Sequence, residues 1–295
     1  MTNHERRGNE KMQLLEKNEK VNYLYIAALP IVTTYIFELK KQWKKFVIFS
    51  MMAVAFVILL SYLPYALIPD NPLPETQADY FQSGLNFLIL LTIFSACFFF
   101  SGIICAEFGE KTGYITFPII NKYKLVVGKY LGGLTLNVGV IAAFYFTLGV
   151  LGIYYYGAPI NYRYYYSFGI ALLYLIAVSS FVTFFSSFLK SVNMTIVTAL
   201  MILLIGNMIA DSLVMLLVPD FEPIYSLNHA SDLISYILVK DFPTTTADRY
   251  EEVKFRGFTR RIWLTPTIEM GITIFLLYTV ICLMVAAIIF KRRQL

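Results

Sequence analysis

The chain has 295 residues, of which 58% are hydrophobic and only 15% are charged, and its formal net charge is +5. Soluble domains are about 45–50% apolar and about 25% charged, so this chain has too few charged residues to cover a globule of its length. The composition argues against a soluble enzyme, a disordered chain and a disulfide-stapled secreted domain, and it indicates an integral membrane protein.

The start of the chain divides into a polar part and an amphipathic part. The first 20 residues are polar and lack the apolar core of a signal peptide, and residues 1–30 are predicted to be a cytoplasmic tail. In residues 31–45, apolar side chains and lysines follow different faces of a helix: the apolar ones are Val32, Ile36, Leu39, Trp43 and Phe46, and the lysines are Lys40, Lys41, Lys44 and Lys45. This pattern predicts a helix in the lipid headgroup layer with Pro30 in its first turn, the alternative being a plain basic flank of the first span.

Six apolar stretches are each long enough to cross a hydrocarbon layer of about 30 Å as a helix. They are residues 46–68, 85–105, 131–154, 167–189, 195–218 and 268–290. Lysine and arginine gather in the connections that would share one side, such as those holding Lys111, Lys122 and Lys190. This bias predicts a multi-pass protein of the cell membrane with both termini in the cytoplasm and an external connection over residues 219–267.

The cytoplasmic connection between the second and third spans, residues 106–130, is too polar for the membrane and too apolar for a free linker. Thr112-Gly113 and Pro118 interrupt it, which predicts two short helices. An apolar face flanked by charges fits a docking surface for a soluble protein. Packing of this connection against its own neighbours is an equally open alternative.

The external connection has two local signals. Apolar residues at helical spacing predict a short amphipathic helix over 226–239 that dips back towards the bilayer. Thr265 and Pro266 are expected to be the N-cap and the first-turn proline of the last span.

Few residues suggest chemistry. No GxxxxGK[ST] loop occurs, so this chain is not expected to bind ATP or to be an enzyme. The three cysteines lie in apolar runs and the two histidines lie far apart, which argues against a disulfide or a metal site. Asp211, within the fifth apolar stretch, is a costly carboxylate that could bind a cationic substrate, relay protons or pair with an external arginine.

The cytoplasmic connection reads Glu107-x-x-Glu110-Lys111-Thr112-Gly113, followed by Phe117-Pro118 and Gly128-Lys129. Together with six spans, both ends inside and a lysine-bearing interfacial helix, this connection resembles that of the permease subunits of type-two ATP-binding-cassette (ABC) exporters. The resemblance is sharp over residues 106–130 and architectural over residues 31–295. The external loop departs from the usual pattern in its longer polar portion.

The resemblance implies an all-α transmembrane domain with an N-terminal elbow helix and a coupling helix over about residues 107–121. It implies an export pathway of two permeases, as a homodimer or heterodimer, on two separate ATPase subunits that hold ATP and Mg. The residues expected to couple to the ATPase are Glu107, Glu110, Lys111, Thr112, Gly113, Phe117 and Pro118. The residues expected along the substrate pathway are Phe94, Phe98, Asn207 and Asp211.

This mostly neutral, aromatic lining suits hydrophobic or amphipathic substrates. The alternatives are a secondary transporter, which needs charged or broken spans at the bilayer midplane, and a membrane assembly protein without transport activity.

Overall fold

The computed structural model describes residues 3–67, 72–109, 113, 116, 118, 120–218, 221–240, 242–243, 245–255 and 258–293, with side chains described outside residues 3–27, 215 and 253–260. Within these ranges, six helical segments are long and apolar enough to span a membrane. They are Ala28–Leu67, Gln77–Gly109, Lys122–Tyr156, Arg163–Phe188, Val192–Val214 and Ile268–Arg292. The prediction of six apolar helices is confirmed, and the chain is a helical protein with the composition of a multi-pass membrane protein.

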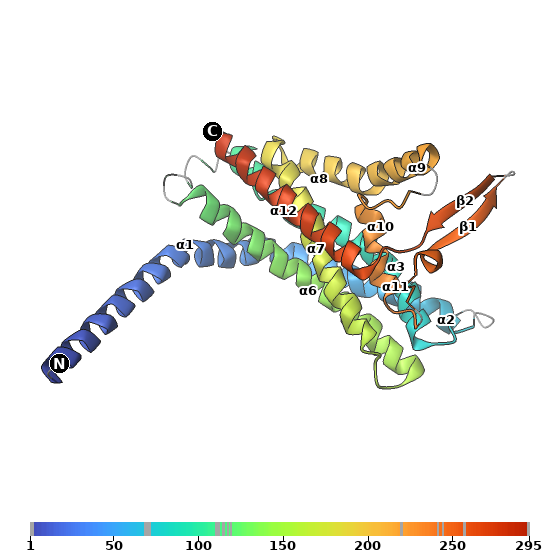
Figure 1. The fold of residues 1–295 in the computed structure, drawn as a ribbon, viewed down its shortest axis with the longest axis horizontal. Coiled ribbons are helices and arrows are strands. Elements are labelled where there is room, and N and C mark those ends of the chain that lie inside the picture. The colour runs from blue at the N-terminus through green and yellow to red at the C-terminus, as the bar shows by residue number, and fades with distance from the viewer. Residues whose placement is uncertain are drawn as a thin grey trace.

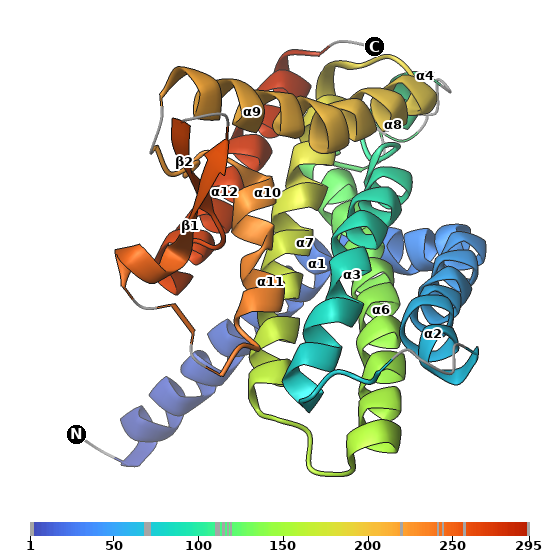
Figure 2. The ribbon, with the colours of Figure 1, turned by 90° about the vertical axis from the view of Figure 1, so that its right-hand side faces the viewer.

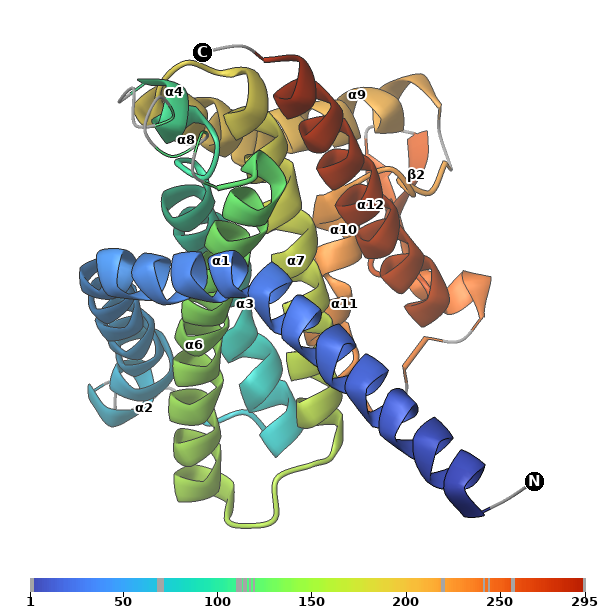
Figure 3. The same ribbon diagram turned by 90° about the vertical axis from the view of Figure 1, so that its left-hand side faces the viewer.

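The first segment is longer than the sequence pattern predicts. Helix α1 runs from Asn3 to Val57 without interruption and continues through the π-helical turn η1 (Ile58–Tyr62) into α2 (Leu63–Leu67). Pro30 lies inside α1, so the helix start expected near this proline is wrong. A proline inside a helix removes a hydrogen-bond donor and favours a bend. Figure 3 shows α1 changing direction, with one part lying across α6 before the chain turns to run beside α6 towards α2.

Three helices form the centre of the bundle (Figure 2): α3 (Gln77–Phe100), α6 (Lys122–Tyr156) and α7 (Arg163–Phe188). The last helix, α12 (Ile268–Arg292), packs against α7. Their shared interior contains the fully buried rings of Tyr80, Phe99, Phe144, Tyr174 and Phe275. One buried polar contact joins α3 to α6, because Ser95 Oγ donates to Asn137 Oδ1 at 2.8 Å. This contact agrees with the preference of membrane helices for polar side chains at their interfaces.

Helix α1 contacts α6 through small residues. Gly128 and Gly132 of α6 are buried and lie against the polar face of α1. This face carries Thr34, Glu38 and Gln42, which are only 5%, 4% and 3% exposed. Small residues let two helix backbones approach closely. The two glycines therefore leave room for the polar side chains of α1 to be buried against α6.

The outer faces of the same part of α1 agree with the amphipathic pattern. Val32, Ile36 and Trp43 are 49%, 45% and 56% exposed. The four lysines at residues 40, 41, 44 and 45 are also exposed. Val32, Ile36 and Trp43 therefore face outwards, whereas Leu39 and Phe46 of the same stripe pack against the core and Lys45 Nζ donates to the Phe98 carbonyl at 2.9 Å. A separate polar face of α1 binds α6.

The fifth apolar segment crosses the bundle. It consists of α8 (Val192–Leu200), the π-helical turn η2 (Met201–Gly206) and α9 (Asn207–Leu217). Figures 1 and 2 show its ribbon running across α3 and α7 instead of alongside them. Helix α8 packs on α3 and α7, whereas α9 reaches α10.

The connection after α9 contains two short helices and a hairpin. The helices α10 (Leu227–Ser231) and α11 (Leu233–Tyr236) confirm the short helical region expected over 226–239. A 3-10 turn, η3 (Thr246–Arg249), then leads into strands β1 (Tyr250–Phe255) and β2 (Phe258–Trp263), which pair antiparallel with Tyr250 opposite Trp263. This hairpin was not predicted from the sequence.

The last helix begins later than predicted. Thr267, not Thr265, is the N-cap of α12, and its side chain accepts a hydrogen bond from Met270 N at 3.2 Å. Pro266 therefore precedes the helix and does not occupy its first turn.

The contact between α1 and α6 leads to a stability prediction. A Cβ at Gly128 would lie 2.7 Å from Thr34 Cβ and 2.8 Å from the Ile31 carbonyl oxygen. Gly128→Ala should therefore lower the free energy of unfolding by about 1–3 kcal/mol through overpacking. Thermal unfolding of the detergent-purified protein measures this change. The matched control is Gly169→Ala on α7, where a Cβ meets nothing within 4 Å, and equal stabilities of the two variants would contradict the packing argument.

Candidate functional site

A buried ion pair anchors the connection between α3 and α6. Glu107 lies on the short helix α4 (Cys105–Gly109), and its carboxylate accepts hydrogen bonds from Lys129 Nζ on α6 and from Thr116 Oγ1 at 3.0 Å. The side chains of Glu107 and Lys129 are each 6% exposed. A buried charge without a partner is costly, so this ion pair holds α4 and the connection between α3 and α6 against the first turns of α6.

The end of α7 supports the same region. Ser186 Oγ accepts hydrogen bonds from the backbone N–H groups of Ile104 and Cys105, both at 3.0 Å, and donates to the Ser101 carbonyl at 2.7 Å. One hydroxyl therefore holds the irregular turn between α3 and α4. This turn leaves the α-helical hydrogen-bond pattern, and its freed backbone groups need such a partner.

Arg293, the residue directly after α12, contacts the C-terminal end of α7. Arg293 Nη1 donates to the carbonyl oxygens of Ser187 and Leu189 at 2.9 and 3.0 Å, and its guanidinium lies 4.1 Å from the Phe108 ring centre. Carbonyl groups at a helix C-terminus lack partners within the helix, and a cation there is favourable. We call this assembly of α4, the first turns of α6 and the last turns of α7 and α12 the α4 platform.

The residues that resemble a coupling motif have different places on the α4 platform. Glu107 and Gly113 are buried, and Pro118 is exposed. Glu110, Lys111, Thr112 and Phe117 lie outside the described residues. The Glu107 carboxylate contacts Lys129 of its own chain, so its observed partners are intramolecular.

A second group of polar residues surrounds a cavity between α9, α10 and β2, which we call the α9–α10 cavity. Its volume is about 140 Å³. The lining residues are Asp211, Val214, Phe221, Pro223, Asn228, His229, Asp232 and Trp263. The cavity thus combines two carboxylates, an imidazole, an amide and two aromatic rings.

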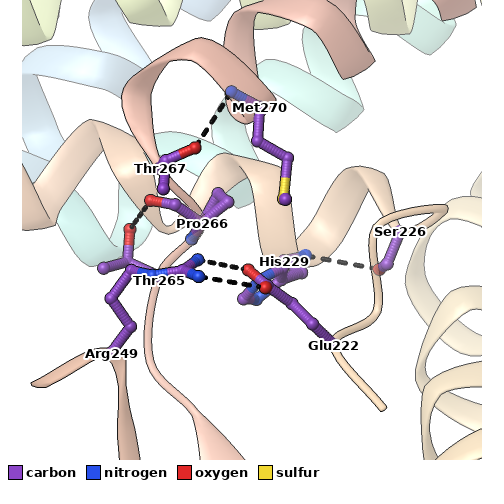
Figure 4. Close-up of polar contacts among 8 residues, drawn as sticks. All are labelled: Glu222, Ser226, His229, Arg249, Thr265, Pro266, Thr267 and Met270. Atoms are coloured by element: carbon purple, nitrogen blue, oxygen red, sulfur yellow. Dashed lines mark hydrogen bonds and ion pairs between the residues drawn. The ribbon is translucent and has the colours of Figure 1, made fainter. Parts of the chain in front are cut away.

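One wall of this cavity is held by the network shown in Figure 4. Arg249 Nη1 and Nη2 donate to the two carboxylate oxygens of Glu222 at 2.5 and 3.2 Å, and His229 Nε2 lies 3.5 Å from the same carboxylate. The Arg249 guanidinium also lies 5.4 Å from the Trp263 ring centre. Two-pronged pairing of guanidinium and carboxylate sets both side chains in one geometry. The hairpin, through Arg249 before β1 and Trp263 at the end of β2, is thereby fixed to the start of α10.

Asp211 links α9 to α10. Its Oδ2 accepts a hydrogen bond from Ser226 Oγ at 2.8 Å, and the same hydroxyl caps α10 by accepting from His229 N at 3.3 Å. The same carboxylate also interacts with the buried hydroxyl of Tyr225. Arg249, an arginine of the connection between α9 and α12, pairs with Glu222 and not with Asp211.

The surroundings of the cavity shift the pKa values of nearby ionisable side chains. Burial, with a smaller contribution from the nearby Asp211, raises the pKa of Asp232 to about 7. Burial lowers the pKa of His229, although Glu222 acts in the opposite direction. Burial and the Asp211 carboxylate also raise the pKa of Tyr225 to about 12. At neutral pH, Asp232 is therefore only partly ionised, and burial favours the neutral form of the His229 imidazole.

The predicted pathway residues do not gather around one cavity. Phe94 and Phe98 lie on α3, and the Phe98 ring contacts Phe49 of α1 with 5.6 Å between ring centres. Asn207 begins α9 after the π-helical turn, and Asp211 lines the α9–α10 cavity. The two aromatic candidates and Asp211 thus contact different elements of this chain.

A scan of the chain against protein-family models finds no match, and a search among curated proteins finds no match either.

Sequence reasoning missed Glu222, His229, Arg249 and Trp263 as site residues. Each lies in the connection between α9 and α12, where the sequence pattern of mixed charges did not indicate a defined structure. The signal that could have found them is the pair of β-prone stretches at 250–255 and 258–263, which bring a tryptophan next to an arginine.

The raised pKa of Asp232 predicts a pH dependence of stability. Its ordinary value is 3.8 and its value in the folded protein is about 7, so folding favours the protonated form. The contribution of Asp232 is fully present below its ordinary pKa and is lost as the pH rises through 7. Asp232→Asn stays neutral, and its thermal stability should therefore rise relative to the unmodified protein between pH 4 and pH 8.

The contribution of His229 to stability changes with pH in the opposite direction. Burial lowers its pKa, so this contribution is lost as the pH falls below the ordinary value of 6.5. Both proteins contain His229, so the difference between their pH profiles isolates Asp232. Asp248→Asn, which changes an exposed carboxylate, is the matched control. Parallel profiles for Asp232→Asn and the unmodified protein would refute the shift.

Proposed function

We propose that the chain is the permease subunit of an ABC exporter, working with a second permease and with separate ATPase subunits that supply ATP hydrolysis. The observation that carries this proposal is the α4 platform with its buried Glu107–Lys129 pair. A connection that passes force from a soluble motor to membrane helices has to be stiff. The ion pair, the Ser186 hydroxyl and Arg293 provide that stiffness from three directions.

The arrangement of α1 supports the same proposal. Val32, Ile36 and Trp43 are exposed, while Thr34, Glu38 and Gln42 lie buried on a separate face next to α6, whose first turns carry Lys129. A movement of the α4 platform would therefore reach α6 directly and α1 through the glycine contact. In the proposed exporter, this part of α1 is the elbow helix and the segment from α4 to residue 121 is the coupling region.

A hollow beside α4 offers room for a docking partner. It has a volume of about 370 Å³ and lies between α4 and the start of α8, with the connection at Lys190 and Ser191 along its edge. We propose that the ATPase binds over this hollow and the exposed Pro118. Glu107 then acts as an internal brace of the docking surface, and the substrates are hydrophobic or amphipathic, as suits an apolar, aromatic bundle.

The decisive test is purification of the tagged chain in mild detergent from the membranes in which it is made. A protein with a phosphate-binding P-loop should copurify, and vesicles that contain the complex should hydrolyse ATP. An intact, folded chain that copurifies with no ATPase, or that moves cargo without one, would overturn the proposal and favour a secondary transporter or an assembly protein.

The role of Glu107 is tested by a charge exchange. Glu107→Lys places two cations in a buried site, and breaking such a pair costs about 3–5 kcal/mol, so it should distort the α4 platform and lower ATPase copurification at least about tenfold. The double variant Glu107→Lys, Lys129→Glu should restore copurification if Glu107 is a brace.

Glu75→Lys, which reverses an exposed charge just before α3, is the matched control and should leave copurification unchanged. A double variant that is folded, by thermal unfolding and gel filtration, and still fails to bind the ATPase would show that Glu107 itself touches the partner.

A further inference from the structure

We infer that the α4 platform binds a negatively charged surface of the ATPase, with one acidic side chain of that subunit on Lys190 and others facing Lys291 and Arg292. This inference rests on the proposed function, because it takes the ATPase as the partner. It adds the chemistry by which the two subunits recognise each other.

The exposed charges at this end of the protein are basic. Lys190 follows the end of α7, and Lys291 and Arg292 are the last residues of α12; all three are exposed. The two groups lie close together, because Arg293 Nη1 donates to the Leu189 carbonyl oxygen at 3.0 Å, directly before Lys190. Residues about a hundred positions apart in sequence therefore form one basic surface.

The acidic residues of the platform leave this basic surface unbalanced. Glu107 is the one acidic side chain in the described part of the platform, and it is only 6% exposed. Its carboxylate is bound to Lys129 and Thr116 in the interior. Because complementary potentials steer protein partners together, an exposed basic surface of this kind fits an acidic surface on the partner.

Lys190 lies beside a hollow that can receive a side chain of the partner. The hollow has a volume of about 370 Å³, and Lys190 is the one charged residue among the described residues that line it. A cavity of about 150 Å³ accommodates a benzene-sized molecule, so this hollow admits an aspartate or glutamate side chain. Ser191 and Asn193 also line it and offer hydrogen-bonding groups beside the Lys190 ammonium.

The place of the hollow favours a soluble partner over lipid headgroups. Figures 2 and 3 show α4, α8 and the C-terminal end of α12 together at one end of the bundle. Lipid surrounds the sides of a membrane-spanning bundle, whereas its end faces water. A basic surface around a hollow at this end is thus placed for a protein that docks from the aqueous side.

Charge reversal at Lys190 tests the inference. Lys190→Glu sets like charges against each other and should lower the amount of ATPase that copurifies with each folded chain at least about tenfold. Lys190→Arg keeps the charge and should retain the ATPase. Lys240→Glu reverses an exposed lysine in the connection after α11, and this matched control should also retain it.

A carbodiimide crosslink identifies the group that Lys190 meets, because this reagent joins a lysine amine to a carboxylate only where the two are in contact. Peptide mass spectrometry of the treated complex should find Lys190 joined to an aspartate or glutamate of the ATPase. Lys190→Arg has no reactive amine and should lose this crosslink while it keeps the ATPase.

Several outcomes would overturn the inference. Unchanged ATPase copurification with folded Lys190→Glu is one, and a Lys190 crosslink confined to its own chain is another. Lys291→Glu is the second charge variant if Lys190→Glu does not fold, as judged by gel filtration and thermal unfolding. A lower yield of folded Lys190→Glu chain from membranes, with the usual amount of ATPase on each chain, would assign Lys190 to lipid headgroups and reject the acidic partner surface.

The two proposals fail in different ways. An ATPase that binds the unmodified chain and ignores these charge changes rejects the acidic surface and leaves the exporter proposal standing. An unmodified, folded chain that copurifies with no ATPase rejects both.

Discussion

The buried ion pair between Glu107 and Lys129 is the contact on which the arrangement of the helices depends most. Neither charge is tolerable alone at 6% exposure, so α4 and α6 must meet where these side chains meet. This contact fixes the first turns of α6. The same helix then receives α1 on Gly128 and Gly132, and α3 through Asn137. Helix α6 therefore contacts α4, α1 and α3 through separate groups along its length.

Polar groups inside this apolar chain occur at helix ends and crossings, and each group of them has a distinct effect. On the α4 platform, Ser186 and Arg293 satisfy carbonyl and N–H groups that the ends of the helices leave free, which makes the platform rigid. Beside the α9–α10 cavity, Glu222 and Arg249 satisfy each other, and Asp211 accepts a hydrogen bond from Ser226. The first arrangement fixes the turn after α3, and the second fixes the hairpin and α9 to the segment around α10.

Helix α9 connects these features to the surroundings of the protein. It leaves the bundle after η2 and exposes large apolar side chains: Met208 is 67% exposed, Leu216 70% and Leu217 75%. Such a face is stable against lipid tails or against a second apolar helix. Because Asp211 lies on the same helix, whatever covers α9 also influences the closure of the cavity next to α10.

The sequence by itself determined that the chain forms long apolar helices and how many of them could cross a membrane. The reason is that lipid leaves the backbone no partner except its own, so about 20 apolar residues suffice to specify a helix. Only the tertiary structure decided which polar residues pair, because charge pairing depends on distance in space. Glu107 pairs with Lys129, 22 residues away in sequence, and Glu222 pairs with Arg249, 27 residues away. It also decided the bounds that local signals misjudged, since Pro30 lies inside α1 and Thr267 replaces Thr265 as the cap of α12. Helix ends and hairpins are stabilised by packing and capping contacts, and these form only once distant segments lie together.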